Sequence, residues 1–355
     1  MTDPTRAFLR RLLIAAVCAA AACRSVGPPR TVQDRFDYAE ALSRSWKEQM
    51  LLNLVKLRYA DAPVFLDVAS VISQYALQGQ VTAGGQFPGI GGNSASVGGT
   101  MQWSDKPTIT FAPLTGQKFT KSLLTPITPA AVMDLIQAGW PVDITFRVAV
   151  RAVNGVQAGT RNRVIGQAAD PRFASVIDAL RRLQQKGAIA VRTEKKGEKE
   201  ASILVISRLS DPESGSDRQL VADTLGLEAG AERYELVFGA LNSTKTEVAL
   251  LTRSILEILT DLSFDVRVPP EHEQEGRVGP PLPAEVQKAS NFKVLSGASR
   301  PGDAFAAVRY QGYWFWIDDR DFMSKRAMSF MLVLTALAET GSGVEPPAIT
   351  ISTGN

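Results

Sequence analysis

Apolar residues recur every three or four positions in several segments, which is the pattern of helices with one buried face. Residues 36–59 have this spacing, with Leu42, Trp46 and Met50 on one face. Residues 170–187 also have it, with an aspartate and a proline at the start and a glycine at the end, as expected for a capped helix. Further helices are predicted over 118–124, 129–138, 244–259, where a capping box precedes the apolar run, and 321–339.

Strict alternation of apolar and polar residues predicts a half-buried strand over 142–153, with Ile144 and Phe146 on one face and Arg147 on the other. The Asn-Gly pair that follows is typical of a tight hairpin turn. Other strands are expected over 63–75, 108–111, 188–192, 203–207, 234–238, 264–268, 292–295, 304–310 and 313–317. This order predicts an α+β fold with antiparallel sheets, helices packed on one face, and two subdomains.

The two expected regions are 35–165 and 170–355. The first contains a glycine-rich segment, 79–99, with eight glycines that supply few side chains for packing. We interpret this segment as a hairpin tip, or as a loop that meets the membrane or a partner. The second region contains a loop rich in proline and glutamate over 269–283, which is expected to be exposed.

The N-terminus has the features of a secretory signal over residues 1–22. Arginines come first, and an apolar run of eleven residues follows over 12–22, too short to span a bilayer as a helix. Ala20-Ala21-Ala22-Cys23 resembles the lipobox of bacterial lipoproteins, which implies cleavage before Cys23 and its acylation there. Residues 23–34 would then be the lipidated cysteine and a short tether.

Lipidation at Cys23 predicts attachment to a membrane. Arg24 stands where an aspartate would favour the inner membrane, so we expect the periplasmic face of the outer membrane, with secretion or a periplasmic location as the alternative. Cys18 and Cys23 are the only cysteines, so the mature chain would have no free thiol.

Charge and composition exclude several functions. The whole chain has a formal net charge of +3, and the loss of residues 1–22 leaves it nearly neutral, which gives no basis for nucleic-acid binding. His272 is the only histidine, so neither a histidine-based triad nor a site with several histidine ligands can form. We predict no catalytic residue, metal site or cofactor.

The segment 313–326 combines aromatic, acidic and basic residues within a strand and the start of a helix. One interpretation is a ligand or cation site built by its acids, with the indoles as a wall. The other is that the acids cap the helix and the aromatics alternate between the two faces of the strand. The candidate interaction residues are Trp314, Trp316, Asp318, Asp319, Arg320, Asp321, Lys325 and Arg326.

Residues 54–68, LVKLRYADAPVFLDV, and 314–321, WFWIDDRD, resemble a family of proteobacterial lipoproteins with no assigned activity. The resemblance implies an envelope location and no reaction. We therefore expect a non-enzymatic lipoprotein that docks or assembles with another envelope protein. The alternatives are a hydrolase of envelope glycan that uses carboxylates such as Asp318 and Asp321, and a carrier of small ligands or a subunit of a transport complex.

Overall fold

The computed structural model describes residues 28–86, 94–105, 108–160, 168–196, 199–283, 290, 292–340 and 348–353. The expected signal segment 1–22 and Cys23 lie outside these residues. The chain forms two compact units: 1–59 with 265–332, and 60–264 with 333–355. Both sides of the boundary expected near 165–170 belong to the second unit, so the chain is not divided there. No helix among the described residues is long and apolar enough to cross a membrane.

The α+β class is confirmed. The first unit contains helix α2 (Pro28–Arg58), the short helix α9 (Pro270–Gln274) and the start of α11 (Phe322–Thr340). Its antiparallel sheet has the order β10-β12-β11, formed by Leu295–Gly297, Tyr313–Asp318 and Ala304–Tyr310. Helix α2 contacts β11.

Three details of the first unit differ from the sequence prediction. The expected tether is helical from Pro28 onward. The expected strand over 264–268 contributes a single bridge, between Val266 and Val294. The strand expected over 292–295 begins at Leu295 instead.

The core of the first unit follows the predicted periodicities. In β12, Phe315 and Ile317 are fully buried, whereas Trp314 and Trp316 on the opposite face are half-buried. Helix α2 buries Leu51 and Leu54 completely, together with Met50 and Val55. The alternation of aromatics in β12 therefore reflects one core face and one outer face.

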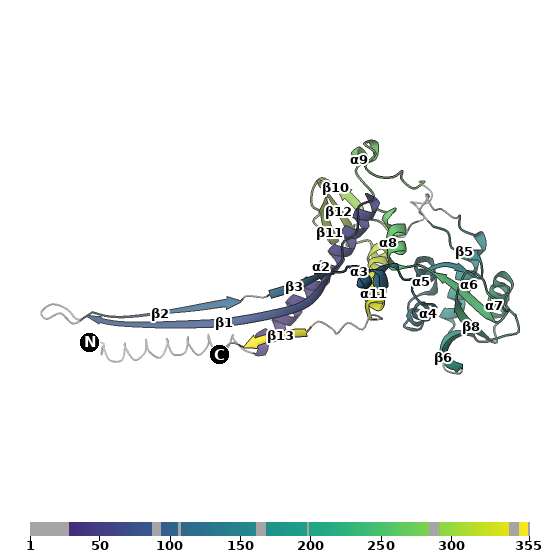
Figure 1. Ribbon diagram of the computed structural model, residues 1–355, viewed down its shortest axis with the longest axis horizontal. Coiled ribbons are helices and arrows are strands. Elements are labelled where there is room, and N and C mark those ends of the chain that lie inside the picture. The colour runs from purple at the N-terminus through teal and green to yellow at the C-terminus, as the bar shows by residue number, and fades with distance from the viewer. Residues whose placement is uncertain are drawn as a thin grey trace, which may run out of the picture. The chain divides into compact units, whose positions relative to one another are not determined.

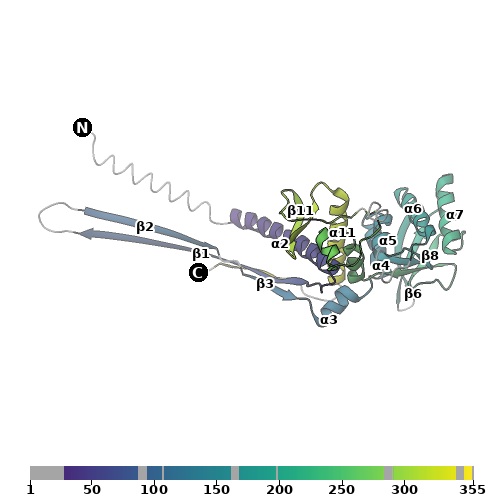
Figure 2. The same ribbon diagram turned by 90° about the horizontal axis from the view of Figure 1, so that it is seen from above.

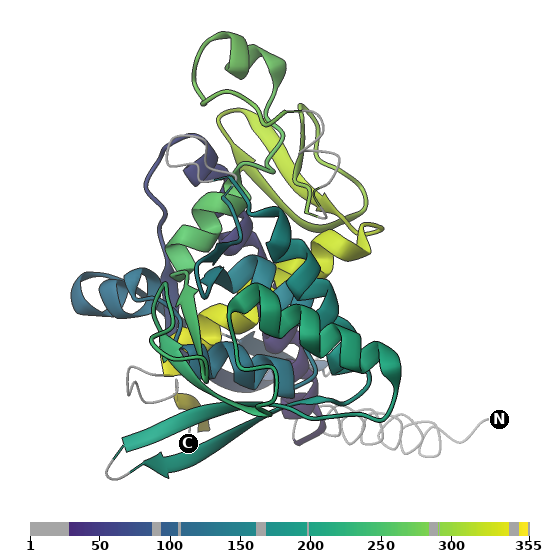
Figure 3. The same ribbon diagram turned by 90° about the vertical axis from the view of Figure 1, so that its right-hand side faces the viewer.

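The second unit is built on a six-stranded sheet with the order β5-β4-β9-β8-β7-β6. The strands are β4 (Val150–Val153), β5 (Val156–Gln157), β6 (Ile189–Lys196), β7 (Lys199–Ile206), β8 (Arg233–Phe238) and β9 (Glu247–Thr252). Pairing is antiparallel except between β8 and β9, so this sheet is mixed rather than wholly antiparallel. The pair β6–β7 forms the teal arrows at the lower edge of Figure 3.

Local sequence explains where three helices of this unit begin. Helices α4 (Pro129–Gln137), α6 (Pro171–Gln185) and α7 (Pro212–Leu225) each start with proline directly after an N-cap side chain. Thr128, Asp170 and Asp211 accept hydrogen bonds from backbone N–H groups of the first turn, which satisfies donors that the helix leaves unpaired. Helix α3 (Gly116–Phe119) and the π-helix η1 (Thr120–Leu124) occupy the helix predicted over 118–124.

The strand prediction over 142–153 was wrong for its first eight residues, which form helix α5 (Val142–Ala149) before β4 begins. Val142, Thr145, Phe146 and Ala149 are buried, and their spacing is that of one helix face. The predicted turn at 154–155 is confirmed, since Asn154 and Gly155 both have positive φ between β4 and β5. The alternation of apolar and polar residues in this segment therefore did not distinguish a strand from a helix.

The helix predicted over 244–259 was wrong in its first half. Residues 247–252 form β9, and helix α8 (Ile255–Ser263) starts only after Ser254, whose side chain accepts a hydrogen bond from the Glu257 N–H. Strand β9 lies between β4 and β8 and buries Val248, Ala249 and Leu250. A strand buried on both faces has a continuous apolar run, which sequence periodicity does not separate from a buried helix.

A second sheet of this unit contains two long strands, β1 (Leu66–Gln86) and β2 (Ser94–Asp105), which run side by side in Figures 1 and 2. Strand β3 (Thr108–Pro113) pairs with the start of β1, and β13 (Ala348–Thr353) pairs with it in parallel over 70–75. Most of the segment 79–99, interpreted as a hairpin tip, is thus paired strand. Residues 87–93 lie outside the described part.

Candidate functional site

The acids of the 313–326 segment are engaged by the chain itself. Asp321 caps α11, accepting hydrogen bonds from the Ser324 N–H at 3.1 Å and the Ser324 hydroxyl at 2.7 Å. Asp318 accepts one from the Arg320 N–H at 2.8 Å. Lys325 forms an ion pair with Asp319 at 2.8 Å. These contacts favour the capping interpretation, because the carboxylate of Asp321 is engaged by the first turn of α11.

The two indoles of this segment are covered by neighbours in the first unit. The guanidinium carbon of Arg300 lies 5.3 Å from the centre of the Trp314 ring, a cation–π contact. Trp316 lies against Gly297, where an added Cβ would be 3.3 Å from the ring. Arg320 forms an exposed ion pair with Asp303, and Arg326 is half-buried on α11. The predicted residues therefore share one corner that is mainly held by its own contacts.

A polar groove of about 500 Å³ runs beside this corner in the first unit. Its walls come from α2 and from the segment around 300–307. Lys47 lies 4.6 Å from the centre of the Phe305 ring, and Arg44 pairs with Glu40 at 3.1 Å. The groove is lined by both acidic and basic side chains, so its charge favours neither anionic nor cationic ligands.

His272 is buried, contrary to the expectation that its loop is exposed. Its exposed fraction is 4 %, and its Nδ1 lies 2.6 Å from the hydroxyl of Tyr59. Tyr310 and Phe315 pack edge-to-face on Tyr59, and Tyr313 packs in the same way on His272. Burial is the main cause that raises the pKa of Tyr59 to about 12. This cluster ties α9 to α2 and has the character of a core.

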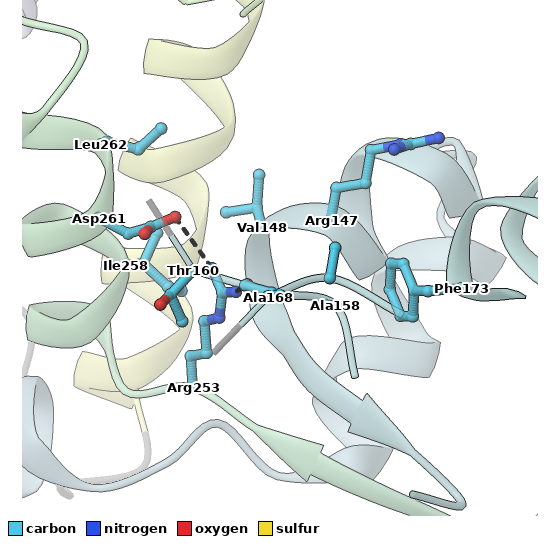
Figure 4. Close-up of a pocket in the computed structure, with 12 residues that line it drawn as sticks. Arg147, Val148, Ala158, Thr160, Ala168, Phe173, Arg253, Ile258, Asp261 and Leu262 are labelled. Carbon is cyan, nitrogen blue, oxygen red and sulfur yellow. Dashed lines mark hydrogen bonds and ion pairs between the residues drawn. The ribbon is translucent and has the colours of Figure 1, made fainter. Parts of the chain in front are cut away.

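A pocket of about 310 Å³ lies in the second unit between α5, α8 and the start of α6 (Figure 4). Arg253 points into it with an exposed fraction of 2 %. Its guanidinium contacts Asp261 Oδ2 at 3.2 Å and donates to the Gly159 carbonyl at 2.6 Å. The carboxylate neutralises this cation, so the pocket does not offer a free site for an anion. The contacts of Arg253 instead connect the end of β9 with α8 and with the segment after β5.

The strongest functional pattern lies in the outer part of β1 and β2. We call residues 76–86 and 94–104 the arm. They form a continuous antiparallel register from the pair Ala76–Ser104 to the pair Gln86–Ser94. Residues directly opposite each other lie on the same face of such a ribbon, and the faces alternate along each strand. The register therefore assigns every arm residue to one of two faces.

The two faces of the arm have different compositions. One face carries the pairs Leu77–Trp103, Gly79–Met101, Val81–Gly99, Ala83–Val97 and Gly85–Ala95. The other carries Ala76–Ser104, Gln78–Gln102, Gln80–Thr100, Thr82–Gly98, Gly84–Ser96 and Gln86–Ser94. The first face is wholly apolar or glycine, and the second carries uncharged polar residues together with Ala76, Gly84 and Gly98. An amphipathic ribbon results.

The edges and the charge of the arm are also distinctive. Among the described strands, none pairs with the outer edge of either arm strand, because β13 and β3 reach only the residues before Ala76. The sequence from Val68 to Ser104 contains no Asp, Glu, Lys or Arg, in a chain where these make up 21 % of residues. Unpaired edges without charge favour further strand pairing.

Sequence reasoning missed this pattern because glycines interrupt the apolar positions. The signals that could have found it are the absence of charge and the alternation Leu77-x-Gly79-x-Val81-x-Ala83. Across the part of the chain that the structure describes, no group of His, Cys, Asp and Glu is placed to hold a metal ion. Comparison with protein-family models, curated proteins and solved structures finds no match.

Proposed function

We propose that this chain is a non-enzymatic lipoprotein of the bacterial envelope that works by assembling with other chains through its arm. The observation that supports this best is the arm itself, a long ribbon without charged residues whose outer edges pair with no other described strand. An isolated two-stranded ribbon is only marginally stable in water, whereas added strands stabilise it. The arm therefore gains stability when another strand pairs with it.

The partner that fits these edges is the arm of another copy of the chain. A second arm brings the same division into an apolar and a polar face, so that pairing in register continues both faces across the new sheet. A charged partner strand would place unpaired charges beside uncharged positions. The lipidated Cys23, on the periplasmic face of the outer membrane, would concentrate the copies on one surface and so favour the pairing.

Cross-linking of single cysteines tests the assembly. In lipidated protein carrying Thr82→Cys, on the polar face of the arm, we expect covalent dimers between copies after oxidation or a short bifunctional reagent. The matched control is Ser216→Cys, an exposed position on α7 that lies outside the arm. Absence of dimers from Thr82→Cys, or equal dimer yields from both variants, would refute assembly through the arm.

Membrane fractionation tests the anchor separately. We expect the unaltered protein in the outer-membrane fraction and the Cys23→Ala variant in the soluble periplasmic fraction. Mass analysis of the N-terminal peptide should show a diacylglyceryl group and an N-acyl chain on Cys23. Recovery of Cys23→Ala at the unaltered level in the membrane fraction would contradict lipid anchoring without bearing on the edges of the arm.

A further inference from the structure

We propose that the arm inserts into a lipid bilayer, with its apolar face toward the acyl chains and its edges paired to the arms of other copies. The inference rests on the assembly proposed above and adds to it the surroundings of the arm. It follows from three properties of the described strands: the division of the two faces, the length of the ribbon and the absence of charge.

The division of faces matches a sheet that has lipid on one side and water on the other. The apolar face carries Leu77, Val81, Val97, Met101 and Trp103 with only small residues or glycine between them. The polar face carries glutamine, serine and threonine, with one alanine and two glycines among them. In a strand that crosses a bilayer, lipid-facing apolar residues alternate with polar residues that face water. The register of the arm places every large apolar side-chain type on one face and every polar residue type on the other, with Ala76 and glycines as the small residues on the polar face.

The length of the arm matches the thickness of a membrane. A membrane-spanning strand that is tilted by about 45° needs about 9–11 residues. The segment 76–86 has this length, and the register pairs it residue by residue with 94–104. At about 3.3 Å per residue it extends about 36 Å, which projects to about 26 Å along the membrane normal at that tilt.

The placement of charge and of aromatic residues agrees with this length. Asp67 and Asp105 are the charged residues that bound the uncharged stretch, and both lie in the base of the sheet outside the arm. Tyr75, which precedes the arm, and Trp103, at its start, lie near the same end of the ribbon. Tyrosine and tryptophan are enriched where a membrane meets water. The base of the arm thus has the composition of an interface.

Lipid also explains why other copies are required. Backbone N–H and C=O groups in the hydrocarbon region have no water to bond with, so open edges of a sheet do not persist there. A single arm would expose two such edges. Arms of neighbouring copies supply the missing pairing, and the polar faces then line up on the side away from the acyl chains.

The test uses the full lipidated protein in vesicles of phosphatidylethanolamine and phosphatidylglycerol. An environment-sensitive fluorophore is attached to single cysteines at Val81 and Val97, and at their neighbours on the other face, Gln80 and Ser96. We expect blue-shifted emission at the first two positions, quenched severalfold more strongly by spin-labelled acyl chains than at the second two. Equal emission and quenching at all four positions would overturn the insertion.

Cross-linking at Thr82 in the same vesicles separates the two proposals. Dimers together with alternating quenching support both. Dimers without quenching by lipid overturn the insertion and leave assembly standing, with a protein surface covering the apolar face instead. If neither dimers nor quenching is observed, both proposals are overturned. Quenching without dimers would overturn the pairing of edges that the insertion requires.

Discussion

The buried ion pair of the second unit gives the sharpest stability prediction. The side chains of Arg253 and Asp261 are 3 % and 13 % exposed, and the arginine also donates to the Gly159 carbonyl at 2.6 Å. Arg253→Met removes the cation and leaves the mostly buried carboxylate of Asp261 without this ion pair. Breaking a buried pair in this way costs about 3–5 kcal/mol.

A matched control exists on the surface of the same unit. Arg208 forms an ion pair with Glu232 at 3.3 Å and donates to the Gly230 carbonyl at 2.6 Å, but its side chain is 62 % exposed. Arg208→Met should therefore cost less than about 1 kcal/mol. The double variant Arg253→Met with Asp261→Leu should recover much of the loss, because it replaces both charges of the pair by apolar side chains.

The free energy of unfolding of the second unit can be measured from the urea dependence of hydrogen exchange in β4 and β9. This readout follows one unit, which matters because a chain with two units need not unfold in one step. A loss below about 1 kcal/mol for Arg253→Met, or losses of equal size for Arg253→Met and Arg208→Met, would refute the reasoning.

Three further predictions concern local contacts. Asp321→Ala should destabilise the first unit by about 0.5–2 kcal/mol through loss of the α11 cap, and an unchanged urea midpoint would contradict this. Burial raises the pKa of Tyr59 to about 12, so the neutral side chain contributes stability that is present below pH 10 and is lost as the pH rises toward 12. An ultraviolet titration in which all tyrosines ionise together near pH 10 would contradict this. Asn154 donates to the Leu225 carbonyl and accepts from the Ala249 N–H, so Asn154→Ala should cost about 2–3 kcal/mol, and unaltered exchange in β9 would rule this out.

The start of α6 and the turn after β4 were predicted correctly from the sequence. The cap and proline at Asp170 and Pro171, and the turn at Asn154 and Gly155, depend on contacts between near neighbours, so the sequence alone carries them. Strand β9 and helix α5 were less predictable, because their environment is set by elements distant in the chain. For β9, burial on both faces comes from its place between β4 and β8.

The candidate site was predictable only in part. The contacts of Asp321 are local, and the capping interpretation anticipated them. The burial of His272 could not be predicted, since its partner Tyr59 lies 213 residues away in the sequence. The faces of the arm needed the register between β1 and β2, because glycines at positions such as 79 and 99 hide the apolar alternation when either strand is considered alone.

Hydrogen exchange of the arm in vesicles tests the central claim most directly. Amides of residues 76–86 and 94–104 are measured in the full lipidated protein, with the α7 amides as an internal reference for a stable folded segment. Pairing of both edges within lipid predicts that the arm amides exchange as slowly as the reference or more slowly. Exchange of the arm at the rate of an unstructured peptide would contradict both assembly and insertion.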